Sequence, residues 1–378
     1  MRLLLVSSHG ADATYGGAER YVRDLAVGLR ARGHETTVLS AFPPREDAAV
    51  PTRVLHRTDW REDRVRRLRN HAGDVISAPG RRLGSILAEV RPEIVHTSNL
   101  PGIGSGIWEA ARRDGVPVVH TVHDYHLLCP RTTLTRRDGS ACEPSPALCG
   151  VRTRRLARWA GAVGRLIAGS QHLLDTVGGL FPGADQRVIR LPLVPVSAEP
   201  PPPPGSPPAT LGYIGGLTAV KGIELLLAAS PALAERGIEL RMAGDGPLRD
   251  VVQASGVRYL GRVAGAAKAD FLASCDVGVV PSCWDEPSGP PYVVCEWLAS
   301  GRPVFVTRRG GLAETVGAYG GVVPIEESSS GIVDVAAGLR RPDEWAALLD
   351  ALPEVDGDAD LERWLDEHEE VYGAVTGR

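Results

Sequence analysis

The sequence predicts an α/β protein with two doubly wound parallel sheets, and three observations support this fold class. Short apolar segments alternate with amphipathic helical ones along most of the chain, as in repeated strand–helix units. The chain has 378 residues, which suits two domains of ordinary size. A proline-rich run at 199–208 interrupts the alternation, and such a run forms neither a helix nor a central strand. We therefore expect domains at 1–198 and 209–350, joined by this linker.

The first domain contains segments with the apolar composition of buried parallel strands. They lie at 2–7, 35–39, 94–97, 116–122, 166–168 and 188–191. Apolar residues three and four apart predict a helix at 18–32, and Gly33 fits its end. The acidic tail at 351–378 also carries apolar residues at helical spacing. We expect this tail to form a helix that packs back on the body.

The same alternation returns in the second domain. Strands are expected at 210–214, 238–243, 257–260, 277–280, 303–307 and 321–324. Helices are expected at 223–235, 247–254, 268–273, 292–299 and 312–316. Ligands of such sheets bind beyond the carboxyl ends of the strands, so the loops after the strands are the candidate sites.

The segment 282–296 is the most informative of these loops. It runs from the strand at 277–280 into a helix, with Glu286 in the loop and Glu296 inside the helix. Backbone N–H groups at a helix start favour anions, and carboxylates accept hydrogen bonds from sugar hydroxyls. Phosphate and polyol recognition so close together predicts a nucleotide-sugar site.

A glycine loop with a following lysine opens the second domain. Gly215 and Gly216 end its first strand, and Lys221 stands where the next helix begins. Glycines let the backbone approach a ligand closely, and the lysine completes a clamp for a diphosphate. A dehydrogenase fingerprint is the alternative, but the glycine spacing does not fit it and no acidic residue closes the next strand.

The first domain offers two further candidates at strand ends. Gly16 and Gly17 lie between the first strand and the first helix, where a phosphate or a polar acceptor is favoured. His123 directly follows the strand at 116–122, so its side chain can meet a ligand. A structural histidine is the alternative interpretation.

Charge is unevenly distributed along the chain. Residues 1–200 hold 28 basic against 20 acidic residues, whereas the remainder holds 14 against 26. A basic first half fits an anionic acceptor or a membrane surface, and we expect no nucleic acid partner. Seven arginines lie in the segment 61–82. A solvated helix face and a peripheral membrane contact both remain open for this segment.

Cysteine usage and hydropathy indicate a cytoplasmic protein. Six cysteines suit a reducing compartment. Cys129, Cys142 and Cys149 lie near one another in sequence, but their spacing fits no standard zinc signature, and an ordered loop is preferred over a metal site. No apolar run approaches the ~20 residues that a membrane span needs.

Taken together, these motifs resemble the large retaining glycosyltransferase family 4. The segments that carry the resemblance follow the order of that family and lie at 16–20, 123–131, 221–222, 243–247, 300–304 and 310–314. The resemblance implies the GT-B fold, in which two Rossmann-like domains face a central cleft. It also implies a retaining, hexosyltransferase-type activity.

The resemblance further implies roles for individual residues. Glu296 would hold the ribose hydroxyls of the donor and share a crevice with Lys221. The catalytic candidates are His123, Lys221 and Glu286. Further donor contacts are assigned to Gly16, Gly17, Gly215, Gly216, Arg262, Val263, Ser288, Gly289, Tyr292 and Val293. Acceptor contacts are assigned to Tyr15, Glu19, Tyr125 and Arg131.

Two features depart from the family pattern. Nine residues separate Glu286 from Glu296, where the family usually has seven, and the prolines at 290–291 resemble the insertion. Proline has no N–H group to offer a phosphate, so neighbours such as Gly289 would have to supply it. Gly216 stands where the family commonly carries an arginine.

The implied reaction moves a sugar from a nucleoside diphosphate sugar, such as a UDP-sugar, to a hydroxyl of a glycan, glycolipid or specialised metabolite. No cofactor is expected, because the donor is a co-substrate. No paired aspartates accompany the phosphate loops, so a metal ion is not expected either. Retention suggests front-face attack, with Glu286 as a covalent nucleophile the alternative. A nucleotide-sugar epimerase and a catalytically weak nucleotide-sugar-binding partner protein also remain open.

Overall fold

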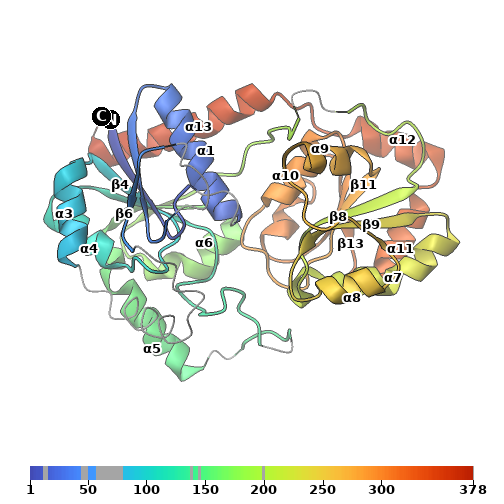
Figure 1. Ribbon diagram of the computed structural model, residues 1–378, viewed down its shortest axis with the longest axis horizontal. Coiled ribbons are helices and arrows are strands. Elements are labelled where there is room, and N and C mark those ends of the chain that lie inside the picture. Colours follow the sequence, from blue (N-terminus) through green and yellow to red (C-terminus); the bar gives the residue numbers. More distant parts are fainter. Residues whose placement is uncertain are drawn as a thin grey trace. The chain divides into compact units, whose positions relative to one another are not determined.

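The computed structural model divides into two compact units (Figure 1). It describes residues 1–11, 16–43, 50–56, 80–136, 139–143, 146–197 and 201–377. Unit 1 comprises 1–134, 142–189 and 364–378, and unit 2 comprises 135–141 and 190–363. The division after Ile189 leaves the proline-rich run in unit 2, and the end of the chain returns to unit 1.

The described residues of unit 1 form a seven-stranded parallel sheet in the order β3-β2-β1-β4-β5-β6-β7. Its strands are β1 (Arg2–Ser7), β2 (Glu35–Ser40), β3 (Thr52–Val54), β4 (Ile94–Thr97), β5 (Val118–Val122), β6 (Val163–Ala168) and β7 (Asp185–Val188). In the sheet, β2 lies on one side of β1, and β4 lies on its other side. This reversal of strand order is the point where doubly wound sheets bind ligands.

Helices and 3-10 turns connect the strands of unit 1. They are α1 (Gly17–Ala31), α3 (Arg81–Val90), α4 (Gly106–Arg113), α5 (Ala147–Leu156), η2 (Ala157–Ala162), α6 (Gln171–Val177) and η3 (Gly178–Leu180). Most of the Arg-rich segment 61–82 lies outside the described residues. Only its last two arginines, at the start of α3, can be placed.

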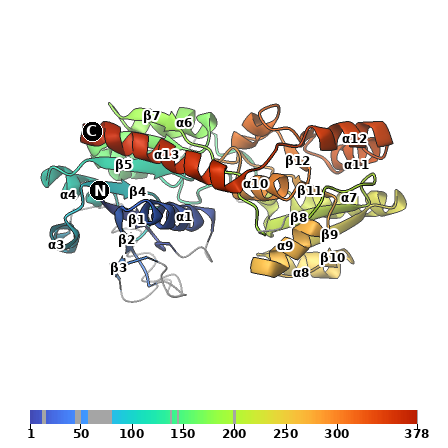
Figure 2. The same cartoon turned by 90° about the horizontal axis from the view of Figure 1, so that it is seen from above.

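The last helix, α13 (Gly357–Thr376), packs against unit 1, as the sequence predicted (Figure 2). Trp364, Leu365 and Tyr372 are at most 2% exposed. Gly28 of α1 allows this approach, because a Cβ there would lie 2.7 Å from the Leu365 side chain. His368 of the same helix hydrogen-bonds the hydroxyl of Tyr21 in α1. The contact is therefore both apolar and polar.

The described residues of unit 2 form a six-stranded parallel sheet in the order β10-β9-β8-β11-β12-β13. Its strands are β8 (Thr210–Gly216), β9 (Glu239–Asp245), β10 (Arg258–Tyr259), β11 (Val277–Val280), β12 (Val304–Thr307) and β13 (Val322–Ile325). The strand order reverses between β8 and β11. The carboxyl ends of these two strands are therefore where this sheet can hold a ligand.

Helices again connect the strands of unit 2. They are η4 (Ala219–Lys221), α7 (Ile223–Glu235), α8 (Arg249–Ala254), α9 (Gly265–Ala273), α10 (Tyr292–Ala299), η5 (Gly311–Thr315), α11 (Ser329–Gly338) and α12 (Pro342–Asp350). Glycines in the sheet determine how closely α10 packs. A Cβ at Gly212 of β8 or Gly278 of β11 would lie 2.6 or 2.4 Å from the Trp297 ring. This contact holds α10, and with it the neighbouring Glu296, against the reversal point.

Most predicted elements differ from the structure by one to three residues at an end, and two differ in position or type. The strand expected at 188–191 is β7 at Asp185–Val188, because the true strand is polar and partly exposed and so lacks an apolar signal. The helix expected at 312–316 is the 3-10 turn η5. Helices α4, α5, α6 and α11 and strand β3 were not predicted at all, and α3 was not predicted beyond Arg82.

Candidate active site

Glu286 is the centre of a charged cluster in unit 2. Three donors converge on its Oε1 atom: Lys221 Nζ at 2.5 Å, Ser282 Oγ at 2.5 Å and the Trp284 indole N–H at 2.9 Å. The residue is only 3% exposed. A buried carboxylate with three donors is held in a fixed position, as a residue next to a reacting centre must be.

A close backbone contact brings Lys221 to Glu286. Gly222 has φ +74°, and a Cβ there would lie 1.9 Å from the carbonyl oxygen of Pro281. Only glycine fits this position, so the start of α7 meets the end of β11. The Lys221 ammonium lies 5.1 Å from the centre of the Trp284 ring, which adds a cation–π attraction.

The glycine loop and the proline-containing loop each contribute a further candidate glycine. Gly216 is exposed, and among the described residues no atom would lie within 4 Å of a Cβ at this position. Gly289 is buried against the backbone of Gly311, where a Cβ would lie 2.1 Å from the carbonyl oxygen. Gly289 therefore has a packing function, whatever it offers a ligand.

The other residues assigned to donor contacts differ in exposure. Ser288, Tyr292 and Val293 are half-buried at the start of α10. Arg262 is exposed after β10, and Val263 packs against an apolar cluster of unit 2.

Glu296 forms a second carboxylate–lysine pair. Its Oε1 atom accepts a hydrogen bond from Lys268 of α9. Glu296 itself is 3% exposed, whereas the Lys268 side chain is 22% exposed. The sequence led us to expect Glu296 and Lys221 in one crevice; Glu296 forms an ion pair with Lys268, to which we had assigned no role.

His123 is the main candidate of unit 1. Its ring lies edge-on to Tyr21, with 4.7 Å between the ring centroids. Burial lowers the pKa of His123 to about 4, although the charge of Glu19 opposes this shift. The imidazole is therefore neutral near pH 7. Its Nε2 atom is buried and has no hydrogen-bond partner among the described residues, so it can accept from or donate to a ligand.

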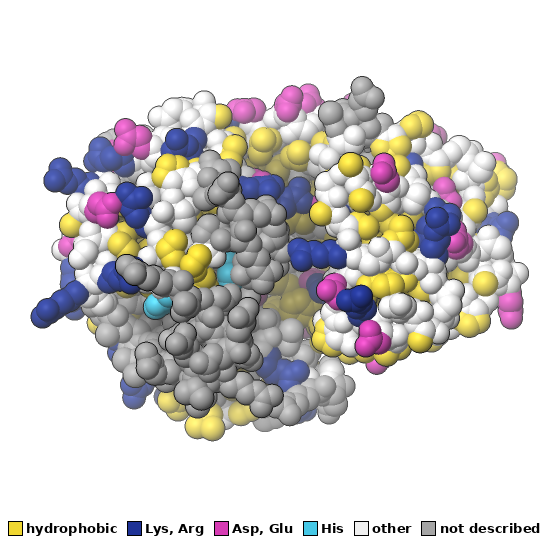
Figure 3. All heavy atoms as spheres, in the orientation of Figure 1, with side chains coloured by type: hydrophobic (Ala, Val, Ile, Leu, Met, Phe, Trp, Pro, Cys, Tyr) yellow, Lys and Arg dark blue, Asp and Glu magenta, His cyan; other side chains and the backbone are white. Residues whose placement is uncertain are grey.

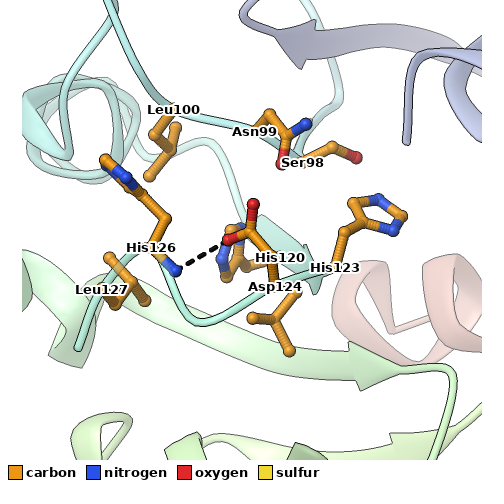
Figure 4. Close-up of a pocket in the computed structure, with 9 residues that line it drawn as sticks. Ser98, Asn99, Leu100, His120, His123, Asp124, His126 and Leu127 are labelled. Carbon is orange, nitrogen blue, oxygen red and sulfur yellow. Dashed lines mark hydrogen bonds between the residues drawn. The ribbon is translucent and has the colours of Figure 1, made fainter. Parts of the chain in front are cut away.

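A small hollow lies at the carboxyl ends of β4 and β5 (Figure 4). It is lined by Ser98, Asn99, Leu100, His120, Val122, His123, Asp124, His126 and Leu127. Asp124 accepts a 2.7 Å hydrogen bond from the backbone N–H of His126, and burial raises its pKa to about 6. A carboxyl of this kind can exchange a proton near neutral pH.

Glu19 lies in a polar group near the start of α1. His9 Nδ1 lies 3.7 Å from Glu19 Oε1, and the Asn99 amide donates to the same oxygen at 3.4 Å. Burial would raise the pKa of Glu19, but the hydrogen bonds of His9 and of the backbone lower it overall. Gly16 and Gly17 are exposed beside it. Tyr15 lies outside the described residues.

The position of Tyr125 does not support its assignment to the acceptor. Its side chain is 0% exposed, and its hydroxyl bonds His172 Nε2 at 3.0 Å. Tyr125 therefore belongs to the core of unit 1, between the end of β5 and helix α6. Arg131, by contrast, is exposed.

Sequence profiles of known families match both halves of the chain. The profile of Glycosyltransferase Family 4 matches residues 15–193, and that of Glycosyl transferases group 1 matches residues 208–340. The chain belongs to glycosyltransferase family 4. The two matches contain the candidates of unit 1 and of unit 2, respectively.

Known proteins resemble this glycosyltransferase over nearly its whole length. Glycogen synthase of Mycobacterium tuberculosis is 28% identical over 375 residues, which cover 90% of this chain and 85% of the relative. Sucrose-phosphate synthase from Thermosynechococcus elongatus has a TM-score of 0.70 at 18% identity, covering 98% and 99% of the two chains. Anabaena Alr3699/HepE in complex with UDP has a TM-score of 0.66 at 18% identity, covering 99% and 100%. These structures confirm the GT-B fold.

The described residues also bear on the metal and membrane interpretations. Within the described ranges, no group of three His, Cys, Asp or Glu residues is arranged to hold a metal ion. The metal interpretation of Cys129, Cys142 and Cys149 therefore gains no support. Nor does any helix in the described part of this glycosyltransferase combine the length and apolarity that crossing a bilayer requires.

Sequence reasoning missed the partners of both glutamates. Ser282 and Trp284 lie within the loop that we singled out, but nothing in their spacing shows that they bond Glu286. Lys268 lies on a different helix from Glu296. One signal was present: of the 42 basic residues only Lys221 and Lys268 are lysines, and each contacts one of the two candidate glutamates.

Proposed function

We propose that this glycosyltransferase moves a sugar from a nucleoside diphosphate sugar to an acceptor hydroxyl, with retention at the anomeric carbon. The observation that carries the proposal is the Lys221–Glu286 cluster at the reversal point of the unit 2 sheet. Glu296 on the following helix adds a carboxylate suited to a ribose diol. Lys221, Glu286 and Glu296, the unit 2 candidates for the phosphates, the sugar and the ribose, thus all follow strands of one sheet.

Lys221 is the proposed partner of the diphosphate. Its side chain is 32% exposed, against 5% for that of Glu286, so the ammonium is the accessible member of the pair. An ammonium has three donors, and the bond to Glu286 uses one of them. The others can meet a phosphate oxygen. As the leaving oxygen gains negative charge, a fixed ammonium stabilises it without reorganisation.

Glu286 is proposed to contact the transferred sugar and to hold Lys221 in position. We favour front-face attack, in which the leaving phosphate takes the acceptor proton and Glu286 forms no bond to carbon. Covalent attack by Glu286 is less favoured, because three donors already stabilise the negative charge of Oε1 and lower its nucleophilicity. His123 is proposed to bind the donor sugar through its neutral imidazole.

We further propose that transfer needs no metal ion, since Lys221 supplies the positive charge beside the diphosphate. Activity should then survive dialysis against EDTA. The UDP complex of Alr3699/HepE favours a UDP-sugar as the donor. The acceptor is proposed to be a hydroxyl of a glycan, a glycolipid or a specialised metabolite.

A panel of UDP-, GDP-, ADP- and dTDP-sugars tests the proposal. Binding raises the melting temperature by mass action, so the true donor should stabilise the protein. NMR of the product made with that donor should show the anomeric configuration of the donor. An inverted product would overturn retention, and failure of every donor to bind would overturn the proposed function.

The loss of a family arginine at Gly216 favours one second candidate, a catalytically weak nucleotide-sugar-binding partner protein. Such a protein would bind the donor but show neither transfer nor slow donor hydrolysis. In such a protein, Glu286→Ala would change only the affinity for the donor. An epimerase would convert the donor with no acceptor present, and the same assay detects that product.

A further inference from the structure

Helix α5 has one face that packs on unit 1 and one that is exposed. The helix lies at the lower edge of unit 1 in Figure 1, and Thr153 and Leu156 on its packed face are at most 9% exposed. On the other face, Leu148 and Val151 are 82% and 46% exposed. They are three residues apart and so are neighbours on the helix surface. No other large apolar side chain in the described ranges is as exposed as Leu148.

Positive charge continues the exposed face of α5. Arg154 and Arg155 lie three and four residues beyond Val151 and are both exposed, so they are the next neighbours on the same side. Neither forms an ion pair with a described acidic side chain. No acidic residue occurs between Glu143 and Asp175. The positive charge is therefore not compensated within this part of the sequence.

The exposed face ends at Trp159 in η2. The guanidinium of Arg158 lies 4.8 Å from the centre of the Trp159 ring, Arg158 is exposed and Trp159 is half-buried. Tryptophan is enriched where lipid meets water, and arginine is suited to phosphate groups. We call the exposed residues Leu148, Val151, Arg154, Arg155 and Arg158 the α5 face.

The α5 face needs a partner with both apolar and anionic parts. A soluble polyanion would pair with the arginines but would leave Leu148 and Val151 in water. An apolar protein surface would bury the arginines without a counter-charge, which is costly. A bilayer of anionic lipids meets both requirements, because phosphate groups lie directly above the acyl chains.

We propose that the α5 face docks this glycosyltransferase on an anionic lipid bilayer. Leu148 and Val151 enter the boundary between headgroups and acyl chains, and the three arginines of the face pair with lipid phosphates. With 10 residues, α5 is too short to span a bilayer, which takes ~20, so the contact is peripheral. The sequence suggested a membrane contact at 61–82, which is a different segment. Docking requires neither donor nor acceptor and is therefore independent of the proposed transfer reaction.

The test is sedimentation of the full chain with vesicles of phosphatidylcholine, either alone or with about 30% phosphatidylglycerol. The chain should bind the anionic vesicles at least about tenfold more tightly than the neutral ones, and added salt should weaken the binding. Arg154→Gln combined with Arg155→Gln should lower the affinity by about 30-fold, because each arginine near an anionic surface contributes about fivefold. Equal binding to both kinds of vesicle, or no binding to the anionic ones, would overturn the proposal.

Helix α8 offers a matched control. It also exposes an arginine, Arg249, and a valine, Val251, which is 52% exposed, but the acidic Asp250 lies between them. Arg249→Gln combined with Val251→Gln should bind anionic vesicles as the wild-type chain does. If this variant lost as much affinity as the arginine variant of α5, the binding would not be specific to the α5 face.

Leu148→Gln combined with Val151→Gln distinguishes a bilayer from a soluble polyanion. This variant should bind anionic vesicles about tenfold or more weakly, because less apolar area enters the bilayer. Its melting temperature should stay nearly unchanged, since both side chains are exposed. Full vesicle binding by this variant, together with loss of binding by the arginine variant, would identify a site for polyanions and overturn the proposal.

Discussion

The two units share a topology but differ in the chemistry at the carboxyl ends of their strands. In each sheet the strand order reverses beside the first strand, between β1 and β4 in unit 1 and between β8 and β11 in unit 2. Every described histidine lies in unit 1, and both lysines lie in unit 2. Figure 3 shows histidine side chains on the visible face of unit 1 alone.

This difference separates neutral imidazoles in unit 1 from charged ammonium groups in unit 2. Burial lowers the pKa of His120 to about 3 and that of His123 to about 4, so neither carries charge near pH 7. Unit 2 instead presents Lys221 and Lys268 on buried carboxylates. Neutral imidazoles suit hydroxyl groups, and ammonium groups suit phosphates. In the function that we propose, the same sheet topology therefore serves two kinds of ligand contact.

Acidification should produce the largest effect and should affect unit 1 first. Burial lowers the pKa of His96, His120, His123 and His368, so the unfolded chain takes up their protons before the folded chain does. The contribution of these neutral histidines to the free energy of unfolding is fully present above about pH 6.5. It is lost as the pH falls toward 4. Each pKa unit corresponds to about 1.4 kcal/mol, so acidification should lower the free energy of unfolding by several kcal/mol. Asp124, with its raised pKa, acts in the opposite direction but is one group against four.

Hydrogen exchange between pH 7 and 4.5 measures this effect in both units at once. Amides of unit 1 should lose protection at higher pH than amides of unit 2, which serve as the internal control. Equal loss of protection in the two units would show that the histidines are not the cause.

Lys221→Met should cause the next largest effect. Removing the ammonium should lower kcat/KM by about 10²- to 10³-fold, because negative charge on the leaving oxygen is no longer stabilised. Glu286 keeps the bonds from Ser282 and Trp284, so the variant should still fold, as a thermal melt can verify. Lys221→Arg keeps the charge and should retain more activity. Turnover within about threefold of wild type would contradict the role of Lys221.

Much of the fold was predictable, because parallel strands buried on both faces carry continuous apolar runs. The strands at Ile94–Thr97 and Val277–Val280 have the predicted bounds, as do α7 and α10. The edge strand β7 is polar and half-exposed. Its pairing with β6 depends on the sheet rather than on its own composition.

The site was predictable only where it follows strand ends. Lys221 and Glu286 come after β8 and β11, which are neighbours, so the topology itself brings them together. The Lys268–Glu296 bond joins two helices, and no local pattern encodes that packing. Tyr125 shows that a position near a strand end does not by itself place a side chain in the site. It lies two residues beyond the strand-end candidate His123, but the chain turns its side chain into the core.

Two glycines of unit 2 give a smaller, purely structural prediction. Gly222→Ala should destabilise the protein by about 2 kcal/mol or more, because φ is positive and the added Cβ meets the Pro281 carbonyl. Gly216→Ala is the matched control. It lies in open space and should stay within about 0.5 kcal/mol of wild type. Chemical denaturation measures both, and similar values for the two variants would contradict the close approach at Gly222.

Gly216→Arg should produce the smallest effect, and it is a gain. The Glu286 carboxylate offsets part of the Lys221 charge, so a single further cation strengthens the positive field at the proposed diphosphate site. The open space around Gly216 accommodates the longer side chain. Affinity for nucleoside diphosphates should rise by about 3- to 10-fold, as calorimetry can measure.

The gain of Gly216→Arg should vanish for the uncharged nucleoside, and Gly216→Leu, which adds bulk without charge, should not reproduce it. Equal gains for nucleoside and nucleoside diphosphate would show that the arginine acts on the base or the ribose. Lys221 of unit 2 would then not mark the phosphate end of the donor, and the contrast between the neutral imidazoles of unit 1 and the ammonium groups of unit 2 would lose its functional meaning.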